Sequence, residues 1–104
     1  MRYNIGVNLL GKNPFELPVD RKFTRDEVVQ ALRIAIIAEL DAINLYLQFA
    51  KAIDDEKVRK VFEEVAREEK THVGEFLALL KLFDEEQVSE LKKGLEEVKE
   101  LIED

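Results

Sequence analysis

Three residues with metal-binding side chains fall on the faces that two long helices would bury. Along residues 55–83, apolar positions recur every three or four residues, and Glu69 and His72 occupy two neighbouring positions of that stripe. Glu39 interrupts a similar apolar stripe along residues 25–52. An ionised carboxylate at a core position is costly unless it is paired or bound to a metal. These three side chains therefore need a compensating partner.

A metal ion is one such partner. A Glu and a His three residues apart project from the same helix face, and a carboxylate from a facing helix adds a third ligand. Oxygen and nitrogen ligands suit iron or manganese, whereas structural zinc favours Cys and His. Glu-x-x-His with a Glu from another helix is half of the di-iron pattern of four-helix bundles. Two chains related by a two-fold axis would supply the whole pattern.

The same residues also allow a reading without metal. His72 could be a core imidazole hydrogen-bonded to the backbone or to a tyrosine, and Glu39 could pair with Arg33 or Arg67. The chain would then be a metal-free helical oligomerisation scaffold. Tyr46 lies two turns from Glu39 on the same face, and we expect it to be a core aromatic whose hydroxyl hydrogen-bonds near the site.

Helix-start signals divide the sequence into three helices, over about 25–52, 55–83 and 85–102. The signals are the capping box of Thr24 with Glu27, then Asp55, then Asp84 with Gln87. Only two or three residues separate the first two helices, which predicts an antiparallel hairpin. Gly94 weakens the third helix without ending it. We therefore expect an all-α fold, a two-helix hairpin with a short C-terminal helix, pairing into a four-helix bundle.

Residues 1–23 differ from the rest of the chain. They hold two of the four glycines and both prolines, together with several apolar side chains. This predicts an irregular N-terminal arm, either draped over its own domain or reaching another subunit, before a helical domain over residues 24–104. The segment has no signal-peptide core, and the longest apolar run, residues 34–38, is too short to cross a membrane.

Composition limits the partners. The 104 residues suffice for one small domain, and the net charge of −7 disfavours nucleic acid and anionic membranes but favours cations. The sequence has no cysteine, which excludes disulfides, thiolate metal sites and cysteine nucleophiles. The first predicted helix is apolar on nearly all sides, so we expect at least a dimer and a larger ring or cage.

Two segments carry a resemblance to a known family. Residues 37–46, IAELDAINLY, and residues 65–76, VAREEKTHVGEF, resemble the ferritin-like superfamily near the rubrerythrins. One hairpin with a short third helix, over residues 24–102, is similar to the encapsulated ferritins.

The resemblance implies a function and a site. Glu39 matches the iron ligand of the family's first helix, and Glu69 and His72 match its Glu-x-x-His pair. The family implies a ferroxidase, in which dioxygen oxidises Fe(II) at a di-iron site between two chains, with one iron per chain. It also implies an annular decamer that delivers iron for storage to an encapsulin shell, in a cytoplasmic nanocompartment.

Some family features are absent or altered here. Encapsulated ferritins can carry an acidic metal-uptake site beside the iron-ligating Glu of the first helix. Its two positions are Ala38 and Asp41 here, so only Asp41 carries over, and Leu45 replaces a nearby aromatic residue. Residues 98–104 show no recognisable shell-targeting peptide. Without cysteines there is no rubredoxin module, which leaves a di-iron peroxide or oxygen scavenger with an external reductase as an alternative.

Overall fold

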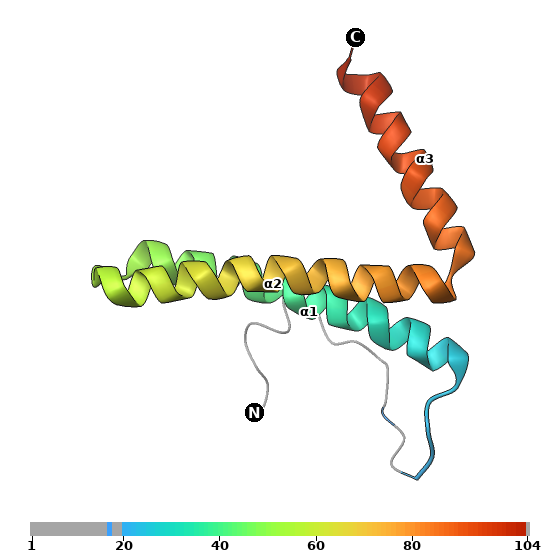
Figure 1. Ribbon diagram of the computed structural model, residues 1–104, viewed down its shortest axis with the longest axis horizontal. Coiled ribbons are helices and arrows are strands. Elements are labelled where there is room, and N and C mark those ends of the chain that lie inside the picture. The colour runs from blue at the N-terminus through green and yellow to red at the C-terminus, as the bar shows by residue number, and fades with distance from the viewer. Residues whose placement is uncertain (1–16, 18–19, 104) are drawn as a thin grey trace.

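Every element of the described structure is a helix. The computed structural model describes residue 17 and residues 20–103, which form α1 (Arg25–Ala52), α2 (Glu56–Phe83) and α3 (Glu85–Ile102) (Figure 1). The all-α prediction is confirmed, and Gly94 does not interrupt α3. The predicted irregular arm, residues 1–23, lies mostly outside the described residues, and residues 20–24 are not helical.

Side-chain caps set where the helices begin. The Thr24 hydroxyl accepts from the Glu27 amide at 3.2 Å, and the Glu27 carboxylate accepts from the Thr24 amide at 2.9 Å, which completes the predicted capping box. Asp55 accepts from the Val58 amide at 3.1 Å at the start of α2. These hydrogen bonds join residues close together in the sequence, which explains why the predicted helix starts agree with those in the structure.

The α1 cap gives a pH-dependent prediction. Hydrogen bonds from Arg21 and from the Thr24 amide lower the pKa of Glu27 from 4.5 to about 2. A carboxyl with a depressed pKa stabilises the fold above its unfolded pKa and stops doing so as pH falls through the folded value. We expect Glu27→Gln to lower the melting temperature at pH 7, and this deficit to shrink between about pH 4.5 and pH 2. Thermal circular dichroism checks it, and a deficit independent of pH would contradict it.

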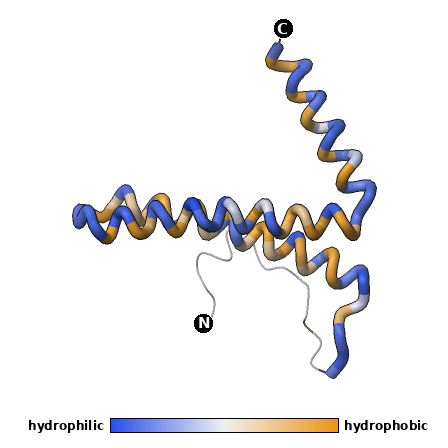
Figure 2. Tube along the Cα trace, viewed as in Figure 1, coloured by the Kyte–Doolittle hydropathy of each residue, from blue (hydrophilic) through white to orange (hydrophobic). Residues whose placement is uncertain are grey.

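The α1–α2 hairpin positions the candidate site. The two helices run antiparallel along most of their length (Figure 1). The described buried core is small and consists of Ile43, Ala50, Ala66 and Leu80. Large apolar side chains of α1 stay exposed, among them Ile37, Leu40, Leu47 and Phe49. Orange segments recur along both helices in Figure 2. Exposed apolar faces of this kind are typical of surfaces that pack against another protein chain.

Helix α3 stands away from the hairpin (Figure 1). Within the described residues it contacts α2 but not α1, and none of its residues is buried. Its apolar stripe, with Val88, Leu91 and Leu95 among its members, is exposed. None of the described helices combines the length and apolar character needed to cross a membrane.

Candidate metal centre

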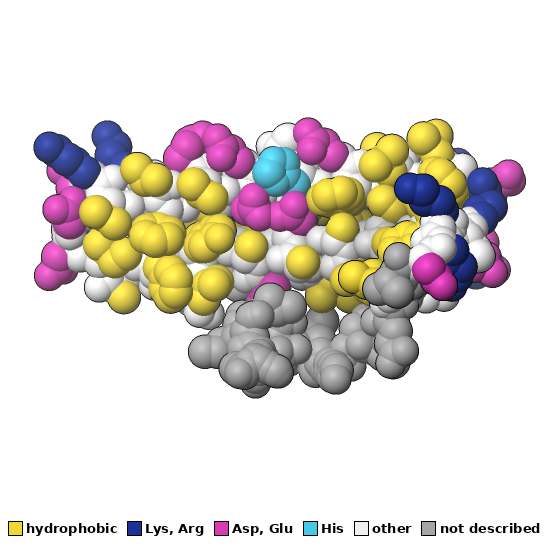
Figure 3. Space-filling model, turned by 90° about the horizontal axis from the view of Figure 1, so that it is seen from below, with side chains coloured by type: hydrophobic (Ala, Val, Ile, Leu, Met, Phe, Trp, Pro, Cys, Tyr) yellow, Lys and Arg dark blue, Asp and Glu magenta, His cyan; other side chains and the backbone are white. Residues whose placement is uncertain are grey.

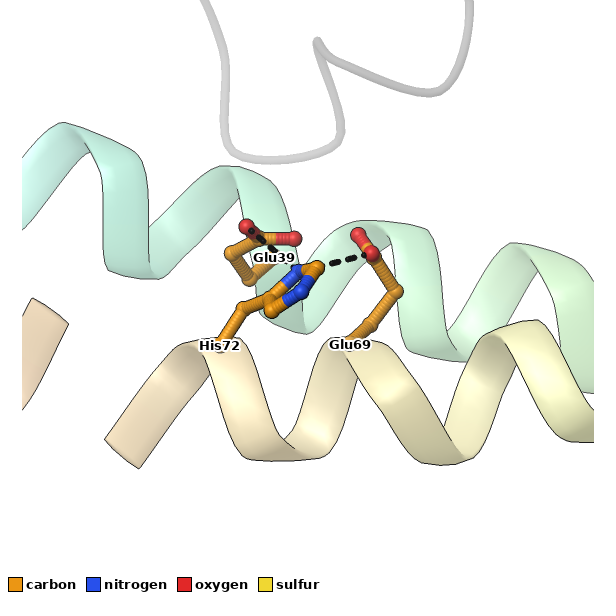
Figure 4. Close-up of side chains that lie close together, drawn as sticks. All are labelled: Glu39, Glu69 and His72. Atoms are coloured by element: carbon orange, nitrogen blue, oxygen red, sulfur yellow. Dashed lines mark ion pairs between the residues drawn. The ribbon is translucent and has the colours of Figure 1, made fainter. Parts of the chain in front are cut away.

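The structure brings the three predicted ligands together near the middle of the hairpin. Glu39 comes from α1, and Glu69 and His72 come from α2, one turn apart (Figure 4). His72 Nδ1 lies 3.0 Å from Glu69 Oε1 and 3.5 Å from Glu39 Oε2. One ligand atom from each residue falls within 4.8 Å of the others. A single cation could therefore be reached by all three.

The two carboxylates are more covered than the imidazole. The side chains of Glu39 and Glu69 are 17% and 18% exposed, whereas His72 is 42% exposed. The pKa of Glu39 is raised, first because its carboxyl group hydrogen-bonds to Glu69, and then by burial and by the charge of Glu69. The negative charge of either carboxylate disfavours ionisation of the other, and a bound cation would offset this repulsion.

The arginines considered as partners for Glu39 are engaged elsewhere. Arg33 binds Asp84 at 2.5 Å, and Arg67 pairs with Glu64 on its own helix. In the described part of the chain, the ion pairs of Glu39 and Glu69 are both with His72. Neither arginine therefore pairs with Glu39 in the structure. The donor set of two carboxylates and one imidazole fits iron or manganese.

Tyr46 and Asp41, which were predicted beside the site, lie outside the three-residue cluster. The Tyr46 ring packs against Phe62, with centroids 5.8 Å apart. Asp41 is half-buried, and its Oδ1 is buried and has no hydrogen-bond partner among the described residues. The metal-uptake role of Asp41 and the supporting role of Tyr46 stay predictions.

An open apolar groove lies beside the site, on the side of the α1–α2 turn. Its volume is about 520 Å³. It is lined by Tyr46, Lys57, Val58, Val61, Phe62 and Val65. Sequence reasoning did not identify this groove, although its valines belong to the same stripe as Glu69 and His72. The sequence feature that could have indicated the groove is side-chain size. The stripe carries valines between the α1–α2 turn and Glu69, and larger side chains beyond His72.

The face that carries the site has a polar centre and apolar flanks. Figure 3 shows the histidine and neighbouring acidic side chains near the middle of the hairpin, with hydrophobic side chains to either side. Val58 and Val61 are exposed on the turn side, and Leu79 is exposed on the other. Such a face can match a second copy of itself about a two-fold axis through its centre.

A helical hairpin with a Glu on one helix and Glu-x-x-His on the next is half of a ferritin-like bundle. A model of the rubrerythrin family matches residues 30–104. The chain therefore belongs to the rubrerythrin family of ferritin-like proteins. The crystal structure of the encapsulated ferritin domain from Pyrococcus furiosus superposes with a TM-score of 0.80 at 58% identity, over 91% of this chain and 97% of that one. The resemblance to encapsulated ferritins is confirmed.

Curated relatives agree with this assignment. A Pyrococcus furiosus ferritin-like-encapsulin shell fusion protein is 59% identical over 89% of this chain. The encapsulin nanocompartment cargo protein EncC of Myxococcus xanthus is 39% identical over 81%. The chain spans 27% of the first relative's length and 65% of the second's.

Proposed function

We propose that this chain is a ferroxidase subunit that oxidises Fe(II) to Fe(III) with dioxygen at a di-iron site shared by two chains. Glu39, Glu69 and His72 of each chain would hold one iron. The observation that carries the proposal is their convergence within 4.8 Å on the apolar-flanked face of the hairpin. Encapsulin appears in the names of both curated relatives, which supports storage of the product inside an encapsulin shell in the cytoplasm.

The carboxylates and the imidazole would play different roles in balancing the charge of the iron. Each chain offers two carboxylates, so a pair of chains offers four negative charges to two Fe(II) ions. The imidazole adds a ligand without adding charge, which leaves the site close to neutral with the substrate bound. Two Fe(II) ions give two electrons to dioxygen, which takes up two protons from water, and the products are two Fe(III) and hydrogen peroxide. The acidic surface would raise the local concentration of Fe(II).

The site is incomplete in one chain, and its geometry favours an antiparallel pair. We place the proposed two-fold axis at the point along α2 that lies midway between Glu69 and His72. At 1.5 Å per residue, Val61 lies about 14 Å from that point on one side, and Leu79 about 13 Å on the other. A two-fold axis perpendicular to the helices would therefore bring Val61 of one chain close to Leu79 of the partner subunit.

Side-chain sizes support this register. Along the apolar stripe of α2, the turn half carries three valines, which line the groove together with Phe62, whereas the half beyond His72 carries Phe76, Leu79 and Phe83. The antiparallel arrangement places large side chains of one chain over the groove of the other, which gives the interlocking packing that helix interfaces need. A parallel arrangement would set large against large and leave groove facing groove. We therefore propose an antiparallel dimer as the unit of a larger ring.

Oxygen consumption tests the proposed reaction. After Fe(II) is added to the metal-free protein, we expect dissolved oxygen to fall with one O₂ consumed per two Fe(II), faster than in buffer alone. Replacing oxygen by hydrogen peroxide under argon distinguishes the scavenger. Peroxide turnover at a rate well above that with oxygen would favour the scavenger, and no acceleration with either oxidant would favour the metal-free scaffold.

A further inference from the structure

The joint between α2 and α3 is a single residue. Asp84 follows the last residue of α2 and precedes the first residue of α3. Its amide donates to the Leu80 carbonyl at 3.0 Å, which closes α2. Its Oδ1 accepts from the Gln87 amide at 2.9 Å, which opens α3. One aspartate therefore ends one helix and starts the next.

Two arginines of α1 reach this joint from far away in the sequence. Arg33 Nη2 donates to Asp84 Oδ2 at 2.5 Å. The Arg25 guanidinium lies 4.7 Å from the centre of the Phe83 ring, and its Nη2 donates to the Phe83 carbonyl at 3.4 Å. Helix α1 does not contact α3, but its two arginines bind Phe83 and Asp84, the residues that directly precede α3.

Little else in the described structure fixes the direction of α3. No residue of α3 is buried, and its contacts with the hairpin are to α2. Its 18 residues extend about 27 Å at 1.5 Å per residue, so a 10° change at the joint would displace the tip by about 5 Å. Small changes at Asp84 therefore decide where the exposed apolar stripe of α3 is presented.

We propose that Arg25 and Arg33 form, with Phe83 and Asp84, a salt-sensitive clamp that sets the direction of α3 relative to the hairpin. The Arg33 and Asp84 side chains are 45% and 21% exposed, so dissolved ions reach the pair. The screening length falls from about 10 Å at 0.1 M salt to about 3 Å at 1 M. High salt weakens the clamp and lets α3 sample a wider range of angles while both helices stay intact.

Spin-label distance measurements test the clamp. Labels are attached to Glu63→Cys on α2 and Glu100→Cys on α3, two exposed positions. Labelled chains are diluted with unlabelled chains, so that the distances measured lie within one chain. The clamp predicts a narrow distance distribution at low salt, and one at least about twice as broad in Arg33→Ala. One molar salt broadens the wild-type distribution but adds little to that of Arg33→Ala.

Two further variants separate the clamp from general loosening. Asp84→Asn keeps an acceptor for the Gln87 amide but loses the charge, and the clamp predicts the same broadening as in Arg33→Ala. Arg67→Ala removes an equal charge from a pair within α2 and should leave the low-salt distribution unchanged. Circular dichroism checks that helix content is retained. A distribution in Arg33→Ala as narrow as in wild type, at both salt concentrations, overturns the proposal whether or not the protein oxidises iron.

Discussion

Replacing His72 by alanine should lower the initial rate of Fe(II) oxidation by about 100-fold or more. His72 lies within 3.5 Å of both carboxylates, and no other histidine exists in the chain to replace it. Removing a residue that only hydrogen-bonds to a metal ligand typically lowers metal affinity or activity by about 10- to 100-fold. Removing a ligand itself should therefore lower the rate by at least about 100-fold. Glu69→Ala should have a comparable effect. Absorbance of Fe(III) after mixing with aerobic Fe(II) measures both.

The matched control is Glu68→Ala, which removes a carboxylate from the neighbouring, exposed position of the same helix. It should keep close to the wild-type rate, because its side chain is not among the three clustered ligands. Circular dichroism should show that all three variants remain helical. Equal rates for Glu68→Ala, Glu69→Ala and His72→Ala would show that oxidation does not take place at this cluster.

The antiparallel dimer gives an equally large expected effect in a cross-linking experiment. The chain has no cysteine, so Val61→Cys with Leu79→Cys introduces the two thiols of the experiment. Both positions are exposed in one chain, at 63% and 44%. Along one helix they are about 27 Å apart, far beyond the reach of a disulfide. Mild oxidation should therefore convert most of the protein to a covalent dimer on a non-reducing gel.

The single variants decide the register. In the antiparallel pair, the two copies of Val61→Cys lie about 28 Å apart on opposite sides of the axis and should not cross-link. Leu79→Cys alone should also remain monomeric on the gel. A parallel pair reverses this pattern, because it brings each position close to its own copy. Efficient cross-linking of Val61→Cys alone would contradict the proposed arrangement.

Local signals explain what the sequence predicted well. Thr24 with Glu27, and Asp84 with Gln87, make hydrogen bonds within four residues of each other, so the helix starts follow from neighbouring residues. The cluster was predictable for a similar reason. Glu69 and His72 share a helix face by spacing alone, and the stripe interrupted by Glu39 had to pack against that face.

Contacts between distant segments explain what the sequence did not predict. The sequence allows Arg33 to pair with Glu39, six residues away, but in the structure Arg33 binds Asp84, which is 51 residues away. Helical periodicity identifies the apolar stripe of α3 but carries no information about the angle between α3 and α2. The groove was missed because it depends on the sizes of Val58, Val61 and Val65 relative to their neighbours, whereas periodicity records only that they are apolar.

Anaerobic Fe(II) titration followed by native mass spectrometry tests the central claim most directly. The claim is that two chains share one di-iron site built from Glu39, Glu69 and His72. It predicts that iron binds to one ion per chain, in assemblies with an even number of chains, and that His72→Ala assemblies bind little or none. Full assembly of the wild-type protein without bound iron would contradict it and would make the three residues structural.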